Sequence, residues 1–457
     1  MKKLFLIPFL VFTFTARAQG SSDSEQANKT KKQALALTLE QAIAYALLNN
    51  YSVINANRDI DASKEKKRET TALGLPQINA GLDYLNNFEF TKQGVTGGGP
   101  FGGKPGQIST IVFGTKHTMI SKVTLSQLIF DGSYVVALQA SKAYLQFFEN
   151  AKKKTNSEVR EMVINSYGNV LLAEESIKIL ESNKAILEKN YNDIDQIYKN
   201  GLAEEESVEQ IAITLASVKS SLNNVKRLKN ISIKMLKLNL GIEINEDLKL
   251  TDNLDELSKT NLSFTFTNTD FKIDNSIDYQ IASSITNQKR LLLKLEKSKV
   301  LPSLGAAVNF GYNSFENDFK LFSQRQKWNN FSNLGVSLNV PIFSSFGRQA
   351  KTQQAQISYE QAQTQQTEIE QKLNLLYEKS KSDFEFSIEQ YATSKTNLNL
   401  AERIEKKQQI KFKEGLSTSF EFSEAQRQLY TAQQNYLQSM ADIINKKAAL
   451  EKLTIQQ

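Results

Sequence analysis

The chain repeats one short stretch: Tyr198–Leu202 (Tyr-Lys-Asn-Gly-Leu) returns as Phe412–Leu416 (Phe-Lys-Glu-Gly-Leu). Two further blocks recur in the same order, Val123–Phe130 as Val336–Phe343 and Leu75–Ala80 as Leu301–Ala306. The three offsets are 214, 213 and 226 residues, so the first copy carries a loop 13 residues longer, visible as the glycine-rich stretch 94–106. Because chance matches would not keep this order, the sequence is an internal duplication.

Each copy is predicted to fold as helix, strand, strand, very long helix, turn and helix. Proline, which breaks helix interiors, is absent between Pro105 and Pro302 and after Pro341. Gly415 is the only glycine after Gly347, so a helix can run unbroken between them. A helix of about 68 residues is about 100 Å long, which predicts a coiled-coil or tunnel architecture.

The spacing of apolar residues agrees with coiled-coil packing. After the first turn they recur at alternating steps of three and four, as in a coiled-coil seam: Val208, Ile211, Leu215, Val218, Leu222 and Val225. The helices on either side of each long helix add up to roughly its length at the same rise per residue. We therefore expect two shorter helices laid end to end along each long one.

These signals divide the chain into five parts. Repeat 1 is 37–241, with a helix at 39–73, strands at 77–90 and 116–129, a long helix at 133–200 and a return helix at 203–240. Repeat 2 is 276–457, with a helix at 277–300, strands at 303–313 and 331–342, a long helix at 348–414 and a return helix at 416–456. Between them lies a polar, strand-prone linker, 242–275. A signal peptide at 1–18 and a polar segment at 19–36 precede repeat 1.

The signal peptide carries a basic start at Lys2, an apolar run and an Ala16-Arg17-Ala18 cleavage signal. The protein is therefore expected to leave the cytoplasm. No later stretch offers the ~18–20 apolar residues of a membrane helix, so entry into a membrane would require β-strands. The chain has no cysteine, one histidine (His117) and a formal charge of +7. These counts argue against thiol or histidine catalysis, a metal site and nucleic-acid binding, so we expect no enzyme and no cofactor.

The predicted strands alternate apolar and polar residues. Ile78, Ala80, Leu82 and Tyr84 alternate with Asn79, Gly81 and Asp83, and the strands of repeat 2 do the same. Period-two alternation over about ten residues is the signature of a transmembrane barrel strand, although an ordinary sheet on a water-soluble core shows it too. Four strands cannot close a barrel and open edges are forbidden in lipid. Two, three or four copies of the chain would supply 8, 12 or 16 strands.

The ordered set of these features resembles the TolC-type outer membrane efflux family, and the opening Leu37-Thr38-Leu39-Glu40-Gln41-Ala42-Ile43 is also similar to that family's start. The resemblance implies a mainly α fold with membrane β: a homotrimer with one shared 12-stranded barrel in the outer membrane, continuous with a long periplasmic α-helical tunnel. It implies a mixed belt around the middle, which residues 242–275 fit in part. The partners implied are a periplasmic adaptor, an inner-membrane transporter and outer-membrane lipid.

The two glycine turns are the first candidate site. A glycine there has a purely structural reading as a helix C-cap with φ > 0. In the similar family such turns meet the adaptor, and an apolar residue follows each glycine here. Gly201, Leu202, Gly415 and Leu416 are therefore the candidate adaptor contacts.

Two acids after the second turn are the other candidate site. Glu421 and Glu424 share a helix face at spacing i, i+3, and the resemblance implies an acidic constriction at these offsets that selects cations. The competing reading is a capping box, because Thr418 stands three residues before Glu421. Both readings can hold together. A salt-bridged latch of the kind found in the family would need a basic residue at Ser417 and an acidic residue at Ser207. Both positions are serine, so such a latch is not expected.

The sequence thus favours a passive exit duct for a tripartite efflux or secretion system. The alternative is a trimeric coiled-coil adhesin or stalk protein, whose strands usually gather at one chain end. Here the strand pairs are internal and duplicated, which favours the duct. A soluble periplasmic scaffold would leave the alternating strands unexplained.

Overall fold

The computed structural model describes residues 35–98, 104–262, 271–319 and 326–454. The expected signal peptide and nearly all of the segment 19–36 lie outside these residues. The helices are α1 (Leu39–Asn49), α2 (Tyr51–Ala72), α3 (Gly132–Lys199), α4 (Glu205–Leu240), α5 (Leu254–Leu262), α6 (Ile277–Ser298), α7 (Gly347–Lys413) and α8 (Ser419–Thr454), with a 3₁₀ turn at Ile273–Asn275. The strands are β1 (Leu35–Leu37), β2 (Gln77–Asn86), β3 (Thr91–Thr96), β4 (Ile108–Phe113), β5 (His117–Asp131), β6 (Leu248–Leu250), β7 (Ser303–Glu316) and β8 (Asn329–Asn339).

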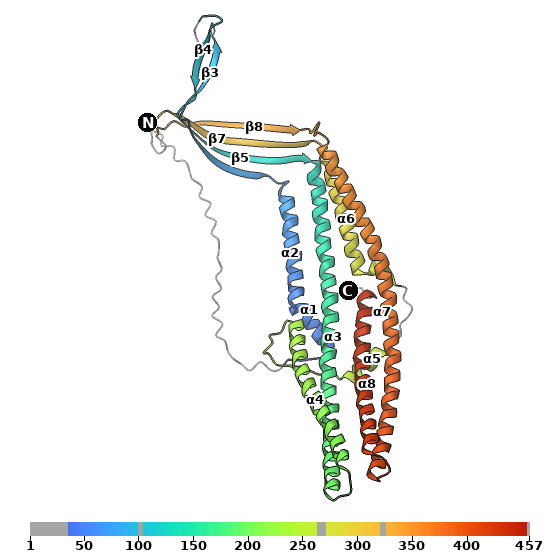
Figure 1. The fold of residues 1–457 in the computed structure, drawn as a ribbon. Coiled ribbons are helices and arrows are strands. Elements are labelled where there is room, and N and C mark those ends of the chain that lie inside the picture. Colours follow the sequence, from blue (N-terminus) through green and yellow to red (C-terminus); the bar gives the residue numbers. More distant parts are fainter. Residues whose placement is uncertain (1–34, 99–103, 263–270, 320–325, 455–457) are drawn as a thin grey trace.

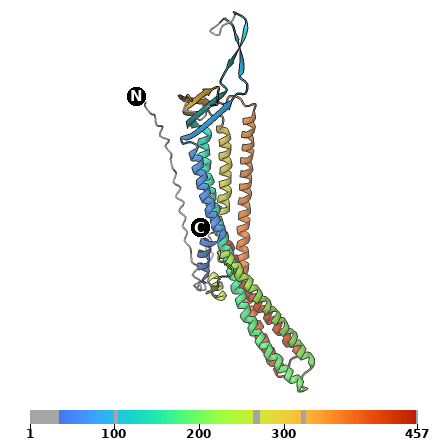
Figure 2. The ribbon, with the colours of Figure 1, turned by 90° about the vertical axis from the view of Figure 1, so that its left-hand side faces the viewer.

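The molecule is elongated, with a sheet at one end and two helical hairpins, α3–α4 and α7–α8, at the other (Figure 1 and Figure 2). The long helices α3 and α7 have 68 and 67 residues. Helices α2 and α4 pack one after the other along α3, and α6 and α8 do the same along α7. The end-to-end arrangement expected from the helix lengths is therefore present. Among the described helices, none combines the length and apolar character needed to cross a bilayer.

The long helices start in different ways. Asp131 caps α3, because its side chain accepts hydrogen bonds from the backbone N–H groups of Ser133 (2.7 Å) and Tyr134 (3.2 Å). Helix α7 has no such cap and follows Ser345 and Phe346, which both have positive φ (47° and 65°). The strand before it, β8, ends at Asn339, two residues before Pro341. Proline cannot donate to a strand ladder, so the second repeat bends sharply into its helix here.

The single opening helix expected at 39–73 is wrong, because the structure breaks it at Asn50. Asn50 has extended backbone (φ −63°, ψ 134°), and its side chain accepts a hydrogen bond from the N–H of Ser52 at 2.8 Å. Its Nδ2 donates to the carbonyl of Asn239 at 2.7 Å. Asparagine is a strong N-cap, so it starts a second helix rather than continuing the first.

A mixed belt surrounds the middle of the helices. Strand β1 pairs in parallel with β6, and α1 and α5 pack against α3 and α8. The side chain of Tyr167 is fully buried, and its hydroxyl contacts the carbonyl of Leu37 and the Oδ2 of Asp252, both at 3.0 Å. Asp252 also accepts a hydrogen bond from the N–H of Leu39 at 2.6 Å. This network ties the start of α1, the centre of α3 and the linker together.

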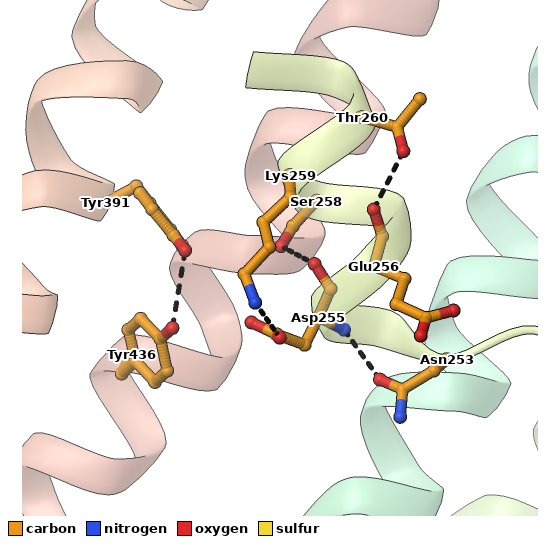
Figure 3. A network of polar contacts seen from close by, with 8 residues as sticks. All are labelled: Asn253, Asp255, Glu256, Ser258, Lys259, Thr260, Tyr391 and Tyr436. Atoms are coloured by element: carbon orange, nitrogen blue, oxygen red, sulfur yellow. Dashed lines mark hydrogen bonds and ion pairs between the residues drawn. The ribbon is translucent and has the colours of Figure 1, made fainter. Parts of the chain in front are cut away.

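The described residues of the strand-prone linker 242–275 form one short strand, β6, a helix, α5, and the 3₁₀ turn Ile273–Asn275. Asn253 accepts a hydrogen bond from the N–H of Asp255 at 2.9 Å, and Lys259 pairs with Asp255 one turn later. Figure 3 shows this helix beside Tyr391 of α7 and Tyr436 of α8, whose hydroxyls lie 3.3 Å apart. Local capping and an i, i+4 pair therefore outweigh the strand preference of the linker. Residues 263–270 of the linker lie outside the described part.

Two apolar clusters form the core. The larger one fills the belt around Tyr167, Leu236, Leu240, Ile443 and Leu450. The smaller one is the α3–α4 seam, where Leu187 and Ile211 are fully buried. Phe412 and Tyr430 of the α7–α8 hairpin pack against this second cluster. The two hairpins are therefore held to each other near their ends.

The main sheet has four antiparallel strands in the order β2-β5-β7-β8. Its central pair, β5 and β7, joins the two repeats. Register places apolar residues opposite one another on one face, with Ile78, Leu125, Val308 and Leu334 in a single row. All four side chains are exposed, so no element of the described residues covers that face.

The opposite face of the sheet carries a polar row, formed by the residues next to the apolar ones: Asn79, Thr124, Asn309 and Asn333. The Thr124 hydroxyl donates to Asn309 Oδ1 at 2.7 Å, and the Asn309 Nδ2 donates to Asn333 Oδ1 at 2.8 Å. Because a one-residue slip would exchange the two faces, these bonds fix which face is polar.

The loop expected at 94–106 is in part a ribbon. Strands β3 and β4 pair with each other as a separate two-stranded sheet that continues beyond β2 and β5, away from the helices (Figure 1). The glycine and proline content suggested only a loop, but the alternating residues on both sides of the turn pair as strands. Residues 99–103 at its end are outside the described part.

Candidate functional site at the ends of the helical hairpins

Both glycine turns lie at the hairpin ends farthest from the sheet (Figure 1). We call residues 200–204 and 414–418 the two hairpin tips. Gly201 and Gly415 have left-handed backbone, with φ of 75° and 70°. A residue with a side chain is strained in this conformation, which explains glycine at both positions.

The hydrogen bonds identify both tips as Schellman motifs. The N–H of Gly201 donates to the carbonyl of Tyr198 (2.8 Å) and that of Leu202 to Ile197 (3.0 Å). In the second tip the N–H of Gly415 donates to Phe412 (3.1 Å) and that of Leu416 to Lys411 (2.8 Å). The structural role expected for the glycines is thus present.

The leucines after the glycines are not needed by this motif. The residue in this position usually packs back onto the helix. Here Leu202 is 81% exposed and Leu416 is 77% exposed. Each tip therefore presents a large apolar side chain to its surroundings.

The second tip has further support that the first lacks. The rings of Phe412 and Phe422 stack with centroids 5.2 Å apart, and Phe422 is buried. Helix α4 begins after Glu204, whose side chain makes no capping hydrogen bond. The tips of the two sequence repeats therefore differ in the contacts that support them.

Glu421 forms the capping box. Its N–H donates to the Thr418 hydroxyl at 3.2 Å, and its carboxylate accepts from the N–H of Thr418 at 3.0 Å. The hydroxyl of Ser417 donates to the same carboxylate at 2.8 Å. These hydrogen bonds, the one from Ser417 first, lower the pKa of Glu421. The carboxylate therefore carries its charge at neutral pH while serving as a cap.

Glu424 has a partner that the sequence interpretation missed. Arg427, one turn later, donates to both its carboxylate oxygens, with Nη2 2.8 Å from Oε1 and Nε 2.9 Å from Oε2. Gln428 adds a contact at 3.2 Å. The hydrogen bond from Arg427 is the main cause of the lowered pKa of Glu424. The i, i+3 spacing was visible in the sequence and could have revealed the pair.

The helix face beyond the tip also contains polar groups inside the α7–α8 seam. Gln426 is 1% exposed, and neither its Oε1 nor its Nε2 has a hydrogen-bond partner within bonding distance. Glu405 of α7 lies nearby and is half-buried, and this burial raises its pKa. Burial, together with the charge of this carboxyl, raises the pKa of Tyr430. The α7–α8 seam thus contains buried polar groups just above the second tip.

Comparison with known proteins agrees with this geometry. A family model described as outer membrane efflux protein matches residues 287–454. Over these residues the chain is similar to that family. The resemblance noted in the sequence is therefore confirmed. No curated protein matches the sequence of this chain.

Solved structures similar to the chain include the following three. The CmeC outer membrane channel of Campylobacter jejuni has a TM-score of 0.72 at 17% identity, covering 91% of this chain and 85% of that one. CusC, described for its folding and transmembrane channel formation, has a TM-score of 0.73 at 17% identity, covering 92% of both chains. The outer membrane protein VceC of Vibrio cholerae has a TM-score of 0.70 at 15% identity, covering 91% of this chain and 95% of that one. The chain therefore has the mainly α fold of these channels over nearly its whole length.

Proposed function

We propose that this protein is a passive outer membrane exit duct, formed by three copies of the chain. The observation that carries the proposal is the four-stranded sheet, whose apolar row is exposed and whose polar row is joined by hydrogen bonds. Its outer strands β2 and β8 each leave one edge unpaired in the described chain. Lipid tolerates no open edge, so neighbouring copies close the sheet into a barrel, with the apolar rows facing lipid.

The helices support the same assembly. Helix α4 exposes Leu228, Ile231, Met235 and Leu238 at coiled-coil spacing, on the side of the chain that α2 and α4 form (Figure 1). Helix α7, on the other side, exposes Leu375, Phe386, Leu400 and Ile404, which share one helix face. Surfaces of this kind are expected where the outer helices of adjacent copies meet. A tunnel built in this way would continue the barrel into the periplasm.

In this proposal the duct performs no chemistry and binds no cofactor. An inner-membrane transporter supplies the energy and a periplasmic adaptor links the two. The adaptor contacts are Leu202 and Leu416, because each is an exposed apolar residue held at a rigid turn. The acidic ring at the entrance rests mainly on Glu421, since Arg427 neutralises Glu424 within its own chain.

Two adjacent residues test the sidedness of the sheet. Leu334 belongs to the apolar row and Asn333 to the polar row of the same strand. Leu334→Lys places a charge in lipid, at a cost of about 2–4 kcal/mol near the bilayer midplane, so trimer yield from outer membranes should fall. Asn333→Lys should insert normally and shift single-channel selectivity in planar bilayers toward anions. If both variants insert equally well, the sheet is not a lipid-facing barrel wall.

A further inference from the structure

The internal duplication provides a template for a contact between copies of the chain. Gly201 matches Gly415 at an offset of 214 residues, and α4 and α8 each begin four residues after their glycine and have 36 residues. The helices on both sides of each tip are continuous. The same offset therefore matches α3 with α7 and α4 with α8, residue by residue, along the hairpins.

Within the chain, α3 packs on α8 in a fixed antiparallel register. Lys452 Nζ lies 2.9 Å from Glu161 Oε2. Seven residues further along α3, a Cβ built on Gly168 would lie 3.9 Å from Asn445 Oδ1. Asn445 is seven residues before Lys452, so the two contacts belong to one register.

On its outer side, α7 has no such neighbour among the described residues. Where the hairpins join the belt, the helices stand in the order α4, α3, α8 and α7 (Figure 1). Helices α4 and α7 are therefore the two edges of this layer in the described part of the chain. In a ring of copies, α4 of the next copy takes the place beside α7 that α8 takes beside α3.

The face of α7 that matches the contact face of α3 is exposed. Leu375 stands at the position of Glu161 and Ser382 at that of Gly168. Leu375 is 68% exposed, Ser382 is exposed, and Phe386, one turn further along, is 58% exposed. These residues share one side of the helix. Helix α7 thus presents the surface that α3 uses to bind α8, and no element of the described residues covers it.

A groove between α7 and α8 matches one that is filled within the chain. Helix α8 enters the groove between α3 and α4, where Asn183 Nδ2 donates to Gln433 Oε1 at 2.8 Å and Tyr430 packs on the α3–α4 seam. The position of Asn183 is taken in α7 by Asn397. With Phe386, Asn397 lines a groove of about 730 Å³ between α7 and α8. A helix equivalent to α8 fits this groove, and that helix is α4.

The matching face of α4 is apolar and exposed. In α8, Asn445 and Lys452 are half-buried because α3 packs on them. Ile231 and Leu238 take these two positions in α4. They belong to a row of four exposed apolar residues at coiled-coil spacing: Leu228, Ile231, Met235 and Leu238.

We propose that α7 of one copy packs on α4 of the next copy in the register in which α3 packs on α8. This inference rests on the proposed trimer. Leu375 then lies against Leu238 of the neighbouring copy, and Ser382 lies against Ile231 of that copy. The contact is heterologous, so three of them close a ring. We call it the α7–α4 seam.

The residues at these positions differ from the template in matched pairs. Inside the chain, Glu161 and Lys452 form an ion pair. At the same two positions of the α7–α4 seam stand Leu375 and Leu238. If only one of the two positions had become apolar, the other would bury a charge without a partner. The joint change is therefore expected if these two leucines face each other.

A second pair shows the reverse change one turn away. Ile164 and Ala448 lie in the same buried cluster and line the same pocket between α3 and α8. Their positions are taken by Glu378 in α7 and Lys234 in α4, both exposed. An apolar pair is thus matched by two opposite charges, which favours this register across an interface. Lys379 lies on the other side of the leucine row and belongs to the polar rim.

The chain contains no cysteine, so pairs of introduced thiols report on the register without background. Ser382→Cys with Ile231→Cys is one matched pair, and Leu375→Cys with Leu238→Cys is the other. Mild oxidation of the trimer in detergent should link α7 of each copy to α4 of the next. Because three links close the ring, the denatured particle should run as a covalent trimer.

Two swapped pairs are the control, since they combine each α7 position with the other α4 position. The same four cysteines are used, but the partners are displaced by seven residues, or about 10 Å along the helix. A disulfide does not form when the Cα atoms are more than roughly 7 Å apart, so the swapped pairs should stay free. Gly168→Cys with Asn445→Cys, the template contact, should link within one chain and leave the mass unchanged.

A charge exchange tests the same register without cysteines. Leu375→Glu should lower the fraction of trimer in native mass spectra, because it places a carboxylate in an apolar seam. Adding Leu238→Lys should restore the trimer, because it recreates the ion pair that Glu161 and Lys452 form inside the chain. If Leu238→Lys lowers the trimer fraction further, the two positions do not face each other.

The mass of the unmodified particle is measured first, because a chain that is not a trimer would overturn the duct and the seam together. An intact trimer in which neither matched pair links would overturn the α7–α4 seam alone. Equal linking of matched and swapped pairs would show that no register is fixed. Covalent products that stop at the dimer would show a two-fold contact. Each of these results contradicts the proposal.

Discussion

The hairpin tips give the most specific test of the proposed coupling to a periplasmic adaptor. The side chains of Leu202 and Leu416 are about four-fifths exposed, and the hydrogen bonds of the turns use only the backbone N–H groups of these residues. Their replacement by Asp should therefore change folding stability by no more than about 0.5 kcal/mol, as for other exposed positions. Thermal unfolding of the trimer checks this first expectation.

The effect on docking should be much larger. Burying a leucine side chain at an interface is worth about 1.5–3 kcal/mol, which is roughly ten- to hundredfold in affinity. We expect Leu202→Asp and Leu416→Asp each to weaken binding of the periplasmic adaptor from the same bacterium by at least that factor. The assay is biolayer interferometry on the trimer in nanodiscs, together with a transport assay in cells.

Glu204→Gln is the matched control. It lies two residues after Leu202, is exposed and makes no capping hydrogen bond, so binding should remain unchanged. If both leucine variants bind the adaptor like the unmodified trimer, the tips are only helix caps and docking occurs elsewhere. If the control loses binding as well, charge at the tip matters rather than the apolar side chain.

Three further predictions follow from the polar groups. Glu421→Gln combined with Glu424→Gln should lower cation selectivity and block by multivalent cations in planar bilayers. Arg427→Gln should raise both, because it frees the Glu424 charge. Unchanged selectivity in all of these variants would contradict the proposed acidic ring. Tyr167→Phe should lower stability by about 1–3 kcal/mol, because it removes a hydrogen bond of a buried hydroxyl beside a carboxylate; thermal unfolding measures it, and a neutral result would contradict the belt network. Burial raises the pKa of Glu405, so its ionised form opposes folding above that pKa and the opposition fades as pH falls through it. Glu405→Gln should therefore raise the melting temperature at neutral pH and lose this advantage in acid, and a pH-independent difference would show that ionisation is irrelevant.

The helical architecture could be predicted from the sequence because the residues that end helices, glycine and proline, stand at few positions. Glycine stands at Gly201 and Gly415, where the backbone needs positive φ, and proline is absent from the long helices. The alternation of the strands was equally clear, since both faces of the sheet follow from period two. These features are decided by residues that are neighbours in the chain. They can therefore be recognised in a single sequence.

Two local features were misread. Asn50 breaks the first helix by capping the next one, although asparagine is equally common on helix surfaces. The glycine-rich stretch after β2 hides a ribbon whose strands pair across their turn. The deciding interactions are a side-chain cap at Asn50 and a backbone ladder in the ribbon, and composition alone reports neither.

The rest of the site could not have been predicted from one sequence. Gln426 becomes buried beside Glu405 only through the register of α8 on α7. Tyr167 meets Asp252 because the linker folds back on α3. Such contacts join residues far apart in the chain, so they depend on packing rather than on any local pattern.

The mass of the purified particle tests the account most directly. The sheet leaves an unpaired edge at β2 and at β8, and only neighbouring copies can close both without an open edge in lipid. Native mass spectrometry of protein extracted from outer membranes in mild detergent should therefore give three times the mass of the mature chain. A stable single chain, soluble without detergent, would contradict the shared barrel and with it the proposed duct.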